Sequence, residues 1–270
     1  MKVTDLTIRT VGDKGFHEQK MLVNGIDFHV NPGEVLGIVG ESGSGKSLSC
    51  LSLLGLTGRS LKSAGQLHFS GQTYSLEDPD ALRALRGKKI GAVFQNPRAS
   101  LNPVRTIGAH FFEVLDRHGE GGGNRKSQAT ALLEAVGIGE ASRRLEQYPH
   151  QLSGGMCQRA MIALALAARP RLLIADEPTT ALDTTIQAQV LDLIDEIRTK
   201  DGMSVIFVSH DLGVIADIAD RVAVMRCGTI VETSACTTLF SSPATPYARS
   251  LVNSISQARR NGPDGRDLYE

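Results

Sequence analysis

Residues 40–47 constrain the fold more than any other stretch, because they fit the phosphate-loop pattern G-x-x-x-x-G-K-[ST] directly after an apolar run at 35–39. The loop consists of Gly40, Glu41, Ser42, Gly43, Ser44, Gly45, Lys46 and Ser47. Its glycines allow positive φ and lack the Cβ that would keep a phosphate away from the backbone N–H groups. We expect Lys46 to bind the β and γ phosphates of a nucleotide and Ser47 to bind Mg²⁺. The strand before the loop and the amphipathic helix after it, which continues with Leu48, are the context that the motif requires.

Composition limits the class of protein and the kind of partner. A chain of 270 residues, 41% of them hydrophobic, can form one large domain or two small ones. The longest strongly apolar stretch, 161–168, is far below the roughly 20 residues of a membrane span. Residues 1–5 lack the layout of a secretory signal, so we expect a cytoplasmic protein. The 29 basic and 29 acidic residues balance and form no long basic block, which argues against nucleic acid as a partner.

The order of apolar runs predicts an α/β fold. Strand patterns at 3–30 and 65–71 predict a first sheet near the N-terminus. Later buried-strand runs alternate with helical stretches, which implies a second, mostly parallel sheet; these runs are 35–39, 90–94, 172–175, 204–208 and 221–225. Between 107 and 166 helical periodicity replaces the strand patterns, so we expect a helical insertion in the α/β core.

Polar side chains follow three of the predicted parallel strands at the carboxyl ends, where ligand-facing residues lie in open α/β sheets. Gln95 follows one strand, Asp176 and Glu177 follow another, and His210 follows a third. Bare carboxylates there are costly unless they serve a cation or a proton. We therefore expect Asp176 to hold Mg²⁺ through water and Glu177 to orient and deprotonate an attacking water. The alternatives are a helix-capping role for the carboxylates and a structural role for the lone histidine.

A second anion site is predicted where Ser153 caps a long helix that begins Gly154-Gly155. An ordinary cap is the alternative. Two glycines weaken a first helical turn by roughly 1 kcal/mol each, however, and this cost suggests that the backbone must approach something closely. Asp183 lies in a turn just past the carboxylate pair.

Together these residues resemble the ATP-binding cassette (ABC) ATPases over roughly residues 3–255. The resemblance assigns Walker A to 40–47, the Q-loop to Gln95, the signature to 152–156, Walker B to Asp176 and Glu177, the D-loop to Asp183 and the switch histidine to His210. It implies a P-loop NTPase (RecA-like) core with an N-terminal antiparallel β subdomain and a helical subdomain at about 104–166. The ATPase domain would then span 1–255, with a short polar tail at 256–270.

The resemblance also implies cofactors and partners. Two such cassettes sandwich two ATP molecules head to tail, each signature closing on the partner's Walker A, so Ser153, Gly154, Gly155 and Asp183 would contact nucleotide and Gln95 would contact Mg²⁺. A second ABC ATPase subunit, integral membrane permease subunits and, indirectly, an extracytoplasmic binding protein would be the partners, at the cytoplasmic face of the membrane. Two departures stand out. Met156 occupies a position where the family more often has Gln, and Phe16 is only one candidate for the adenine-stacking aromatic, with Thr10 at another alignment.

Two further stretches, 94–103 and 243–251, resemble the peptide and nickel importers within this family. Longer peptide-importer ATPases carry a cysteine cluster after the second stretch, and no cysteine follows Cys236 here. That difference, together with Gly154-Gly155-Met156, favours import of nickel or a metal chelate, with a di- or oligopeptide importer as the alternative. A non-transport ABC ATPase or an ATP-binding regulatory module is the alternative from another class. Glu177 argues against a module that only binds ATP.

Overall fold

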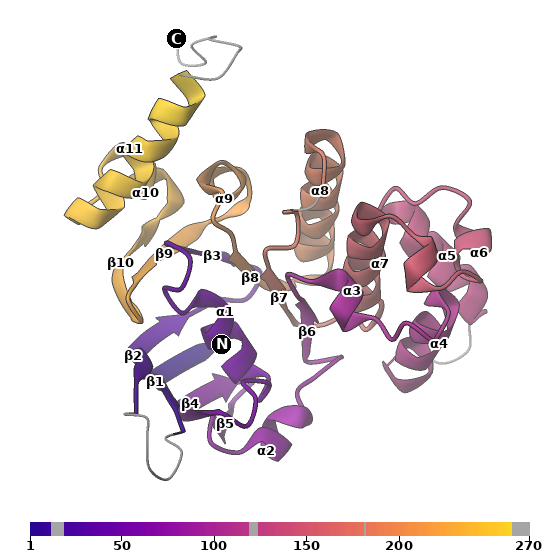
Figure 1. Cartoon of the computed structure of the whole chain (residues 1–270), viewed down its shortest axis with the longest axis horizontal. Helices are drawn as coiled ribbons and strands as arrows, with labels where there is room; N and C mark the ends of the chain where they lie inside the picture. Colours follow the sequence, from indigo (N-terminus) through magenta and orange to yellow (C-terminus); the bar gives the residue numbers. More distant parts are fainter. Residues whose placement is uncertain (12–18, 119–123, 181, 261–270) are drawn as a thin grey trace.

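The fold consists of two β-sheets packed near one another and a group of helices beyond the edge of the larger sheet (Figure 1). This computed structural model describes residues 1–11, 19–118, 124–180 and 182–260. Phe16 lies outside the described residues. No helix in the described ranges is long and apolar enough to cross a membrane.

The smaller sheet is antiparallel and has the strand order β2-β1-β4-β5. Its strands are β1 (Lys2–Thr10), β2 (Met21–His29), β4 (Leu61–Phe69) and β5 (Gln72–Ser75). Val3, Leu6 and Ile8 of β1 are buried, with a register shift between Val3 and Leu6, so one face of this sheet packs against the rest of the protein.

The larger sheet has the order β10-β9-β3-β8-β7-β6 and is parallel except for β10. Its strands are β3 (Val35–Val39), β6 (Ile90–Val93), β7 (Leu172–Asp176), β8 (Ser204–Val208), β9 (Arg221–Arg226) and β10 (Thr229–Ala235). Every residue of β3, β7 and β8 is buried. Helices cover parallel strands on both faces, which explains why these strands are nearly continuous apolar runs.

Helices fill the connections between the parallel strands. Those between β6 and β7 are α3 (Pro97–Ser100), α4 (Ile107–His118), α5 (Arg125–Ala135), α6 (Ala141–Arg144), the 3₁₀ turn η1 (Pro149–Gln151) and α7 (Gly154–Ala167). The remaining helices are α1 (Lys46–Leu53), α2 (Pro79–Arg83), α8 (Thr184–Asp201), α9 (Leu212–Ile218), α10 (Cys236–Ser241) and α11 (Pro246–Arg260). Because α11 continues to Arg260, residues 256–260 of the predicted tail are helical.

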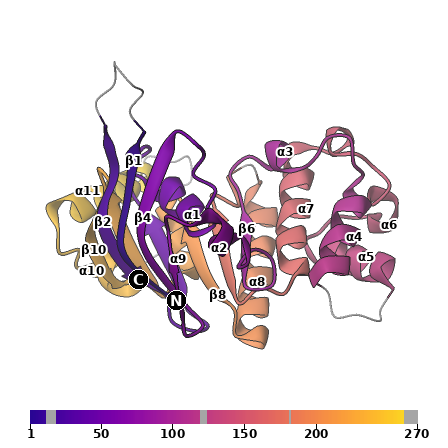
Figure 2. The same ribbon diagram turned by 90° about the horizontal axis from the view of Figure 1, so that it is seen from below.

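Two hydrophobic clusters lie on opposite faces of the larger sheet. Side chains alternate along a strand, so Val35 and Val39 of β3 join one cluster while Leu36 and Ile38 join the other. The first cluster includes residues of α4 to α11, and the second includes residues of α1 and the smaller sheet. The sheet is thus packed on both faces, and Figure 2 shows the same elements from a second direction.

Candidate functional site

Four adjacent parallel strands deliver the predicted site residues to one edge of the larger sheet. The strand order β3-β8-β7-β6 places the phosphate loop, His210, the carboxylate pair and Gln95 next to one another. The register aligns the strand ends, because Ile38 pairs with Val208, Val208 with Asp176, and Val93 with Ala175. Residues far apart in the sequence therefore meet at this edge.

Glycine is required at two positions of the phosphate loop. Gly40 has a φ of 151°, and a Cβ there would lie 2.0 Å from the carbonyl oxygen of Met225 on β9. Gly45 caps α1 with a φ of 107°, a left-handed conformation that L side chains rarely adopt. Glu41, Ser42 and Gly43 are exposed at the rim of the loop, so its backbone is open to a ligand.

Lys46 turns back onto the phosphate loop. Its Nζ donates to the carbonyl oxygens of Gly40 at 2.7 Å and Glu41 at 2.9 Å, and the residue is only 6% exposed. Burial lowers the pKa of Lys46, although the nearby carboxylates of Glu177 and Asp176 oppose the shift. A cation held in this way can move to an entering anion without first leaving the site.

Ser47 and Asp176 converge next to Lys46. The Ser47 hydroxyl donates to Asp176 Oδ1 at 3.0 Å, and Asp176 is 5% exposed. Burial raises the pKa of Asp176, and the bond from Ser47 only partly offsets this effect. Hydroxyl and carboxylate oxygens are the ligands that Mg²⁺ prefers, so this donor set fits the metal that the sequence predicts.

Both carboxylate oxygens of Glu177 are held by neighbouring side chains. Oε1 accepts from His210 Nδ1 at 3.1 Å, while Oε2 accepts from Gln95 Nε2 at 2.9 Å and from the Thr180 hydroxyl at 3.2 Å. Partial burial raises the pKa of Glu177, but the bonds from His210, Thr180 and Gln95 outweigh it, and the net pKa is lowered. The side chain is therefore an oriented, ionised acceptor at neutral pH.

The backbone of Glu177 is also unusual. Its φ is 49°, which is uncommon for a residue other than glycine, and its N–H donates to the Val208 carbonyl at 2.9 Å. Strain of this kind, of order 1–3 kcal/mol, clusters at functional sites. The turn it creates aims the carboxylate at Gln95 and His210, from the two flanking strands.

The predicted second anion site lies on α7, away from the phosphate loop. Ser153 caps α7 and its hydroxyl accepts from the Met156 N–H at 3.2 Å. In both views α7 stands within the helical group while α1 lies between the sheets (Figures 1 and 2). Within one chain, Ser153, Gly154 and Gly155 are thus not brought to Lys46.

Two further predicted residues, Asp183 and Leu48, lie at or near the starts of helices α8 and α1. Asp183 caps α8, its side chain accepting from the Ile186 N–H at 3.0 Å. Leu48 is half-buried and packs on the cluster shared with the smaller sheet. Both positions are compatible with nucleotide contacts made through the backbone or by a second chain.

Two contacts of Glu177 could not be read from the sequence motifs. Thr180 reaches its carboxylate, and Gln158, fully buried on α7, donates to the carbonyl oxygens of Glu177 at 3.2 Å and Pro178. In the sequence, Gln158 could have been singled out only as a polar residue just before the apolar stretch at 160–168. Gln158 links the predicted signature helix to the carboxylate turn.

Comparisons with known proteins agree with this geometry. The family model described as ABC transporter matches residues 23–180. A probable peptide ABC transporter ATP-binding protein of Sinorhizobium fredii is 48% identical, covering 88% of this chain and 72% of that protein. The oligopeptide transport ATP-binding protein OppD of Bacillus subtilis is 43% identical, covering 97% and 73%. The dipeptide transport ATP-binding protein DppD of Haemophilus influenzae is 47% identical, covering 87% and 72%.

A solved structure gives the same result at the level of the fold. The dimeric post-hydrolysis state of an ATP-binding cassette bound to ADP and Pi superposes with a TM-score of 0.76 at 28% identity, covering 87% of this chain and 98% of that one. The predicted P-loop fold, with its mostly parallel sheet, N-terminal antiparallel sheet and added helices, is confirmed. The family model covers more than half of the chain and the curated relatives cover most of it, and we conclude that this chain belongs to the ABC transporter family and is an ATP-binding cassette ATPase.

Proposed function

We propose that this chain is the ATP-hydrolysing subunit of a peptide importer. The observation that carries the proposal is the identity of 43–48% to relatives named for transport of peptides, dipeptides or oligopeptides. The sequence prediction of nickel or a metal chelate finds no support among them, whereas its stated alternative does. That prediction relied on the lack of a cysteine cluster after Cys236, and the relatives extend beyond the length of this chain, which covers 72–73% of them.

The proposed nucleotide site uses the phosphate loop and the residues beside it. Lys46 would exchange its bonds to the Gly40 and Glu41 carbonyls for bonds to the β and γ phosphates. Ser47 and Asp176, together with Gln95 from the end of the neighbouring strand β6, would hold Mg²⁺, which when bound neutralises charge on the phosphates. The backbone N–H groups of the loop and the start of α1 would bind the same anion.

Glu177 is the proposed acceptor for the proton of the attacking water. Its lowered pKa keeps it ionised, and its two oxygens are oriented by His210 on one side and by Gln95 and Thr180 on the other. His210 and Gln95 follow the two strands that flank β7, so they can hold the carboxylate while a water lies between it and the γ phosphate. Water then attacks phosphorus as the bond to ADP breaks.

Ser153, Gly154 and Gly155 are proposed to bind the ATP held by a second cassette, with Asp183 at the same interface. The start of α7 lies apart from the phosphate loop of its own chain, which supports contact in trans. The partners would be a second ABC ATPase, identical or paralogous, and permease subunits at the cytoplasmic face of the membrane. An extracytoplasmic binding protein would take part indirectly.

Uptake in cells tests the transported ligand and the role of Glu177 together. Cells lacking this chain, cells carrying it and cells carrying Glu177→Gln are compared for uptake of a labelled dipeptide and of radioactive nickel. We expect dipeptide uptake to need the chain and to fall by roughly two to four orders of magnitude in Glu177→Gln, because the proton acceptor is lost. A defect confined to nickel would overturn the peptide proposal, and normal uptake in Glu177→Gln would exclude the proposed role of this residue.

A further inference from the structure

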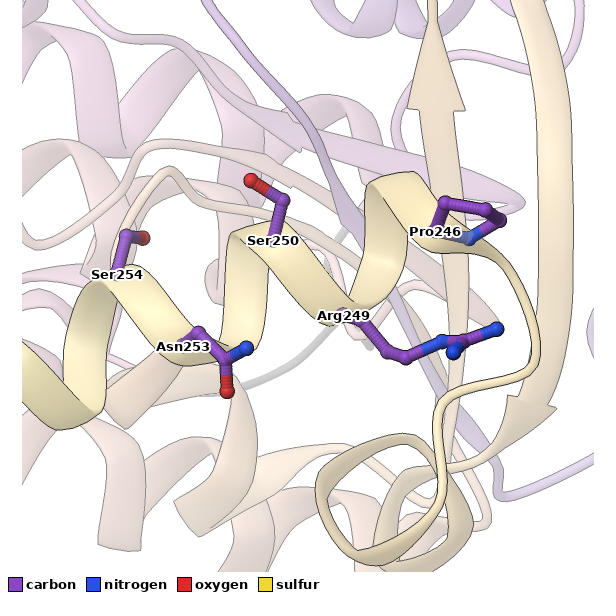
Figure 3. A pocket seen from close by; sticks show the side chains of 5 residues that line it. All are labelled: Pro246, Arg249, Ser250, Asn253 and Ser254. Carbon is purple, nitrogen blue, oxygen red and sulfur yellow. The ribbon is translucent and has the colours of Figure 1, made fainter.

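The C-terminal helix α11 presents one face to the core and the other to solvent. Ala248 is fully buried, and Tyr247, Leu251 and Val252 pack against the cluster that contains β3 and β9. The outer face lines a surface pocket with Pro246, Arg249, Ser250, Asn253 and Ser254 (Figure 3). The contact of α11 with the phosphate loop comes from Tyr247, one of the residues packed on the core.

Tyr247 contacts the phosphate loop directly. Its hydroxyl accepts from the backbone N–H of Glu41 at 3.2 Å. This N–H belongs to the peptide group that joins Gly40 to Glu41, and the carbonyl of the same group accepts from Lys46 Nζ at 2.7 Å. A single peptide group at the start of the loop is therefore held on both sides by side chains.

The position of Tyr247 is itself fixed by neighbouring elements. The guanidinium of Arg226, at the end of β9, lies 4.7 Å from the centre of the Tyr247 ring. The segment leading into α11 is anchored by Glu232 of β10, which is buried and whose carboxylate accepts from the N–H groups of Ala244 at 3.0 Å and Thr245 at 2.8 Å. Tyr247 is thus a fixed support and not a mobile surface side chain.

We propose that Tyr247 is a positioning residue for ATP binding, whose hydroxyl holds the Gly40–Glu41 peptide group when Lys46 moves from the loop carbonyls to the phosphates. This inference rests on the proposed nucleotide site. Once Lys46 leaves, the peptide group loses one of its two side-chain partners, and the Tyr247 hydroxyl keeps it in place. A loop that stays ordered loses less conformational entropy on binding, which strengthens affinity.

The test is ATP binding by the full chain, measured by isothermal titration calorimetry. Tyr247→Phe removes only the hydroxyl and retains the ring that packs on Arg226 and the core. We expect its Kd for ATP to rise about two- to tenfold, because the free loop is then less ordered, and its midpoint of thermal unfolding to fall no further than that of Tyr74→Phe, which also loses one hydrogen bond. Tyr74→Phe is the matched control, because it also removes a hydrogen-bonded hydroxyl but lies on β5, away from the loop, and its Kd should equal that of the wild type.

A Lys46→Ala variant, measured in the same assay, distinguishes an error in this inference from an error in the proposed nucleotide site. If Lys46→Ala binds ATP weakly while Tyr247→Phe binds like the wild type, the inference is wrong and the nucleotide site stands. If Lys46→Ala also binds like the wild type, both are wrong. A fall in the unfolding midpoint of Tyr247→Phe well beyond that of Tyr74→Phe, together with the weaker binding, would show a structural role and would likewise overturn the inference.

Discussion

At the scale of residues, the site places one ammonium and two carboxylates in a largely buried space. The environment shifts the pKa values of the two carboxylates in opposite directions, because burial raises the pKa of Asp176 while hydrogen bonds lower that of Glu177. Asp176 therefore carries a cost of desolvation that the nearby ammonium of Lys46 only partly offsets. With the proposed Mg²⁺ bound, this cost would be offset, so the site would give up stability in exchange for metal binding.

Asp176→Asn should stabilise the chain and weaken its metal-dependent binding. A raised folded-state pKa means that stability is highest with Asp176 protonated and is lost as the pH rises through that pKa. Asparagine mimics the protonated form and still offers an oxygen to Ser47. We expect the midpoint of thermal unfolding without ligands to rise by about 1–4 °C at neutral pH, and Mg²⁺ to improve ATP binding less than in the wild type.

The pH dependence provides the internal check on this prediction. The stabilisation should shrink as the pH falls, since Asp176 of the wild type is then protonated as well. Asp192→Asn is the matched control, because Asp192 is exposed on α8 and its loss of charge should leave both quantities unchanged. A shift in the midpoint that is the same at every pH would contradict the assignment.

At the scale of elements, α7 is tied to the turn after β7 by one buried side chain. Gln158 Nε2 donates to the carbonyl oxygens of Glu177 and Pro178, and its Oε1 has no hydrogen-bond partner among the described residues. The helix that carries Ser153 at its start is thus linked to the strained backbone of Glu177. A buried polar group that is only partly satisfied is costly, so its retention requires a compensating role.

Gln158→Leu should lower both stability and turnover. The change keeps the volume but leaves two carbonyl groups without their donor, and we expect the free energy of unfolding in urea to fall by about 1–3 kcal/mol. ATP turnover should fall further than ATP affinity, because the backbone that aims Glu177 loses its support. Gln128→Leu, the same change on the exposed side of α5, is the control. Wild-type stability with normal turnover in Gln158→Leu would show that the link is dispensable.

The sequence predicted those site residues that stand at strand ends. Gln95, Glu177 and His210 each follow a buried apolar run, and the parallel order of β6, β7 and β8 is enough to bring them together. The sequence did not predict the contacts of Thr180, Gln158 and Tyr247. The contact of Thr180 depends on the positive φ of Glu177, that of Gln158 on the packing of α7, and that of Tyr247 on the docking of α11. None of these is a periodic property of the sequence.

At the scale of the whole molecule, the two predicted anion sites occupy different parts of the chain. The phosphate loop lies between the two sheets, and the start of α7 lies in the helical group beyond β6 (Figure 1). Packing on both faces of the larger sheet holds these parts in place, so closing one site on the other within a chain would need the core to break. A second cassette avoids that cost, and a similar solved cassette is dimeric.

Assembly should therefore depend on ATP and on Ser153. In a Glu177→Gln background, where hydrolysis is blocked, we expect ATP with Mg²⁺ to convert monomers into dimers in sedimentation velocity. Ser153→Arg should prevent this, because its bulk would fill the space of a γ phosphate. The same change also removes a helix cap worth about 1 kcal/mol, so Asn124→Arg, which removes the cap of α5, is the control and should still assemble. Association without ATP, or assembly that survives Ser153→Arg, would exclude contact in trans between α7 and the phosphate loop.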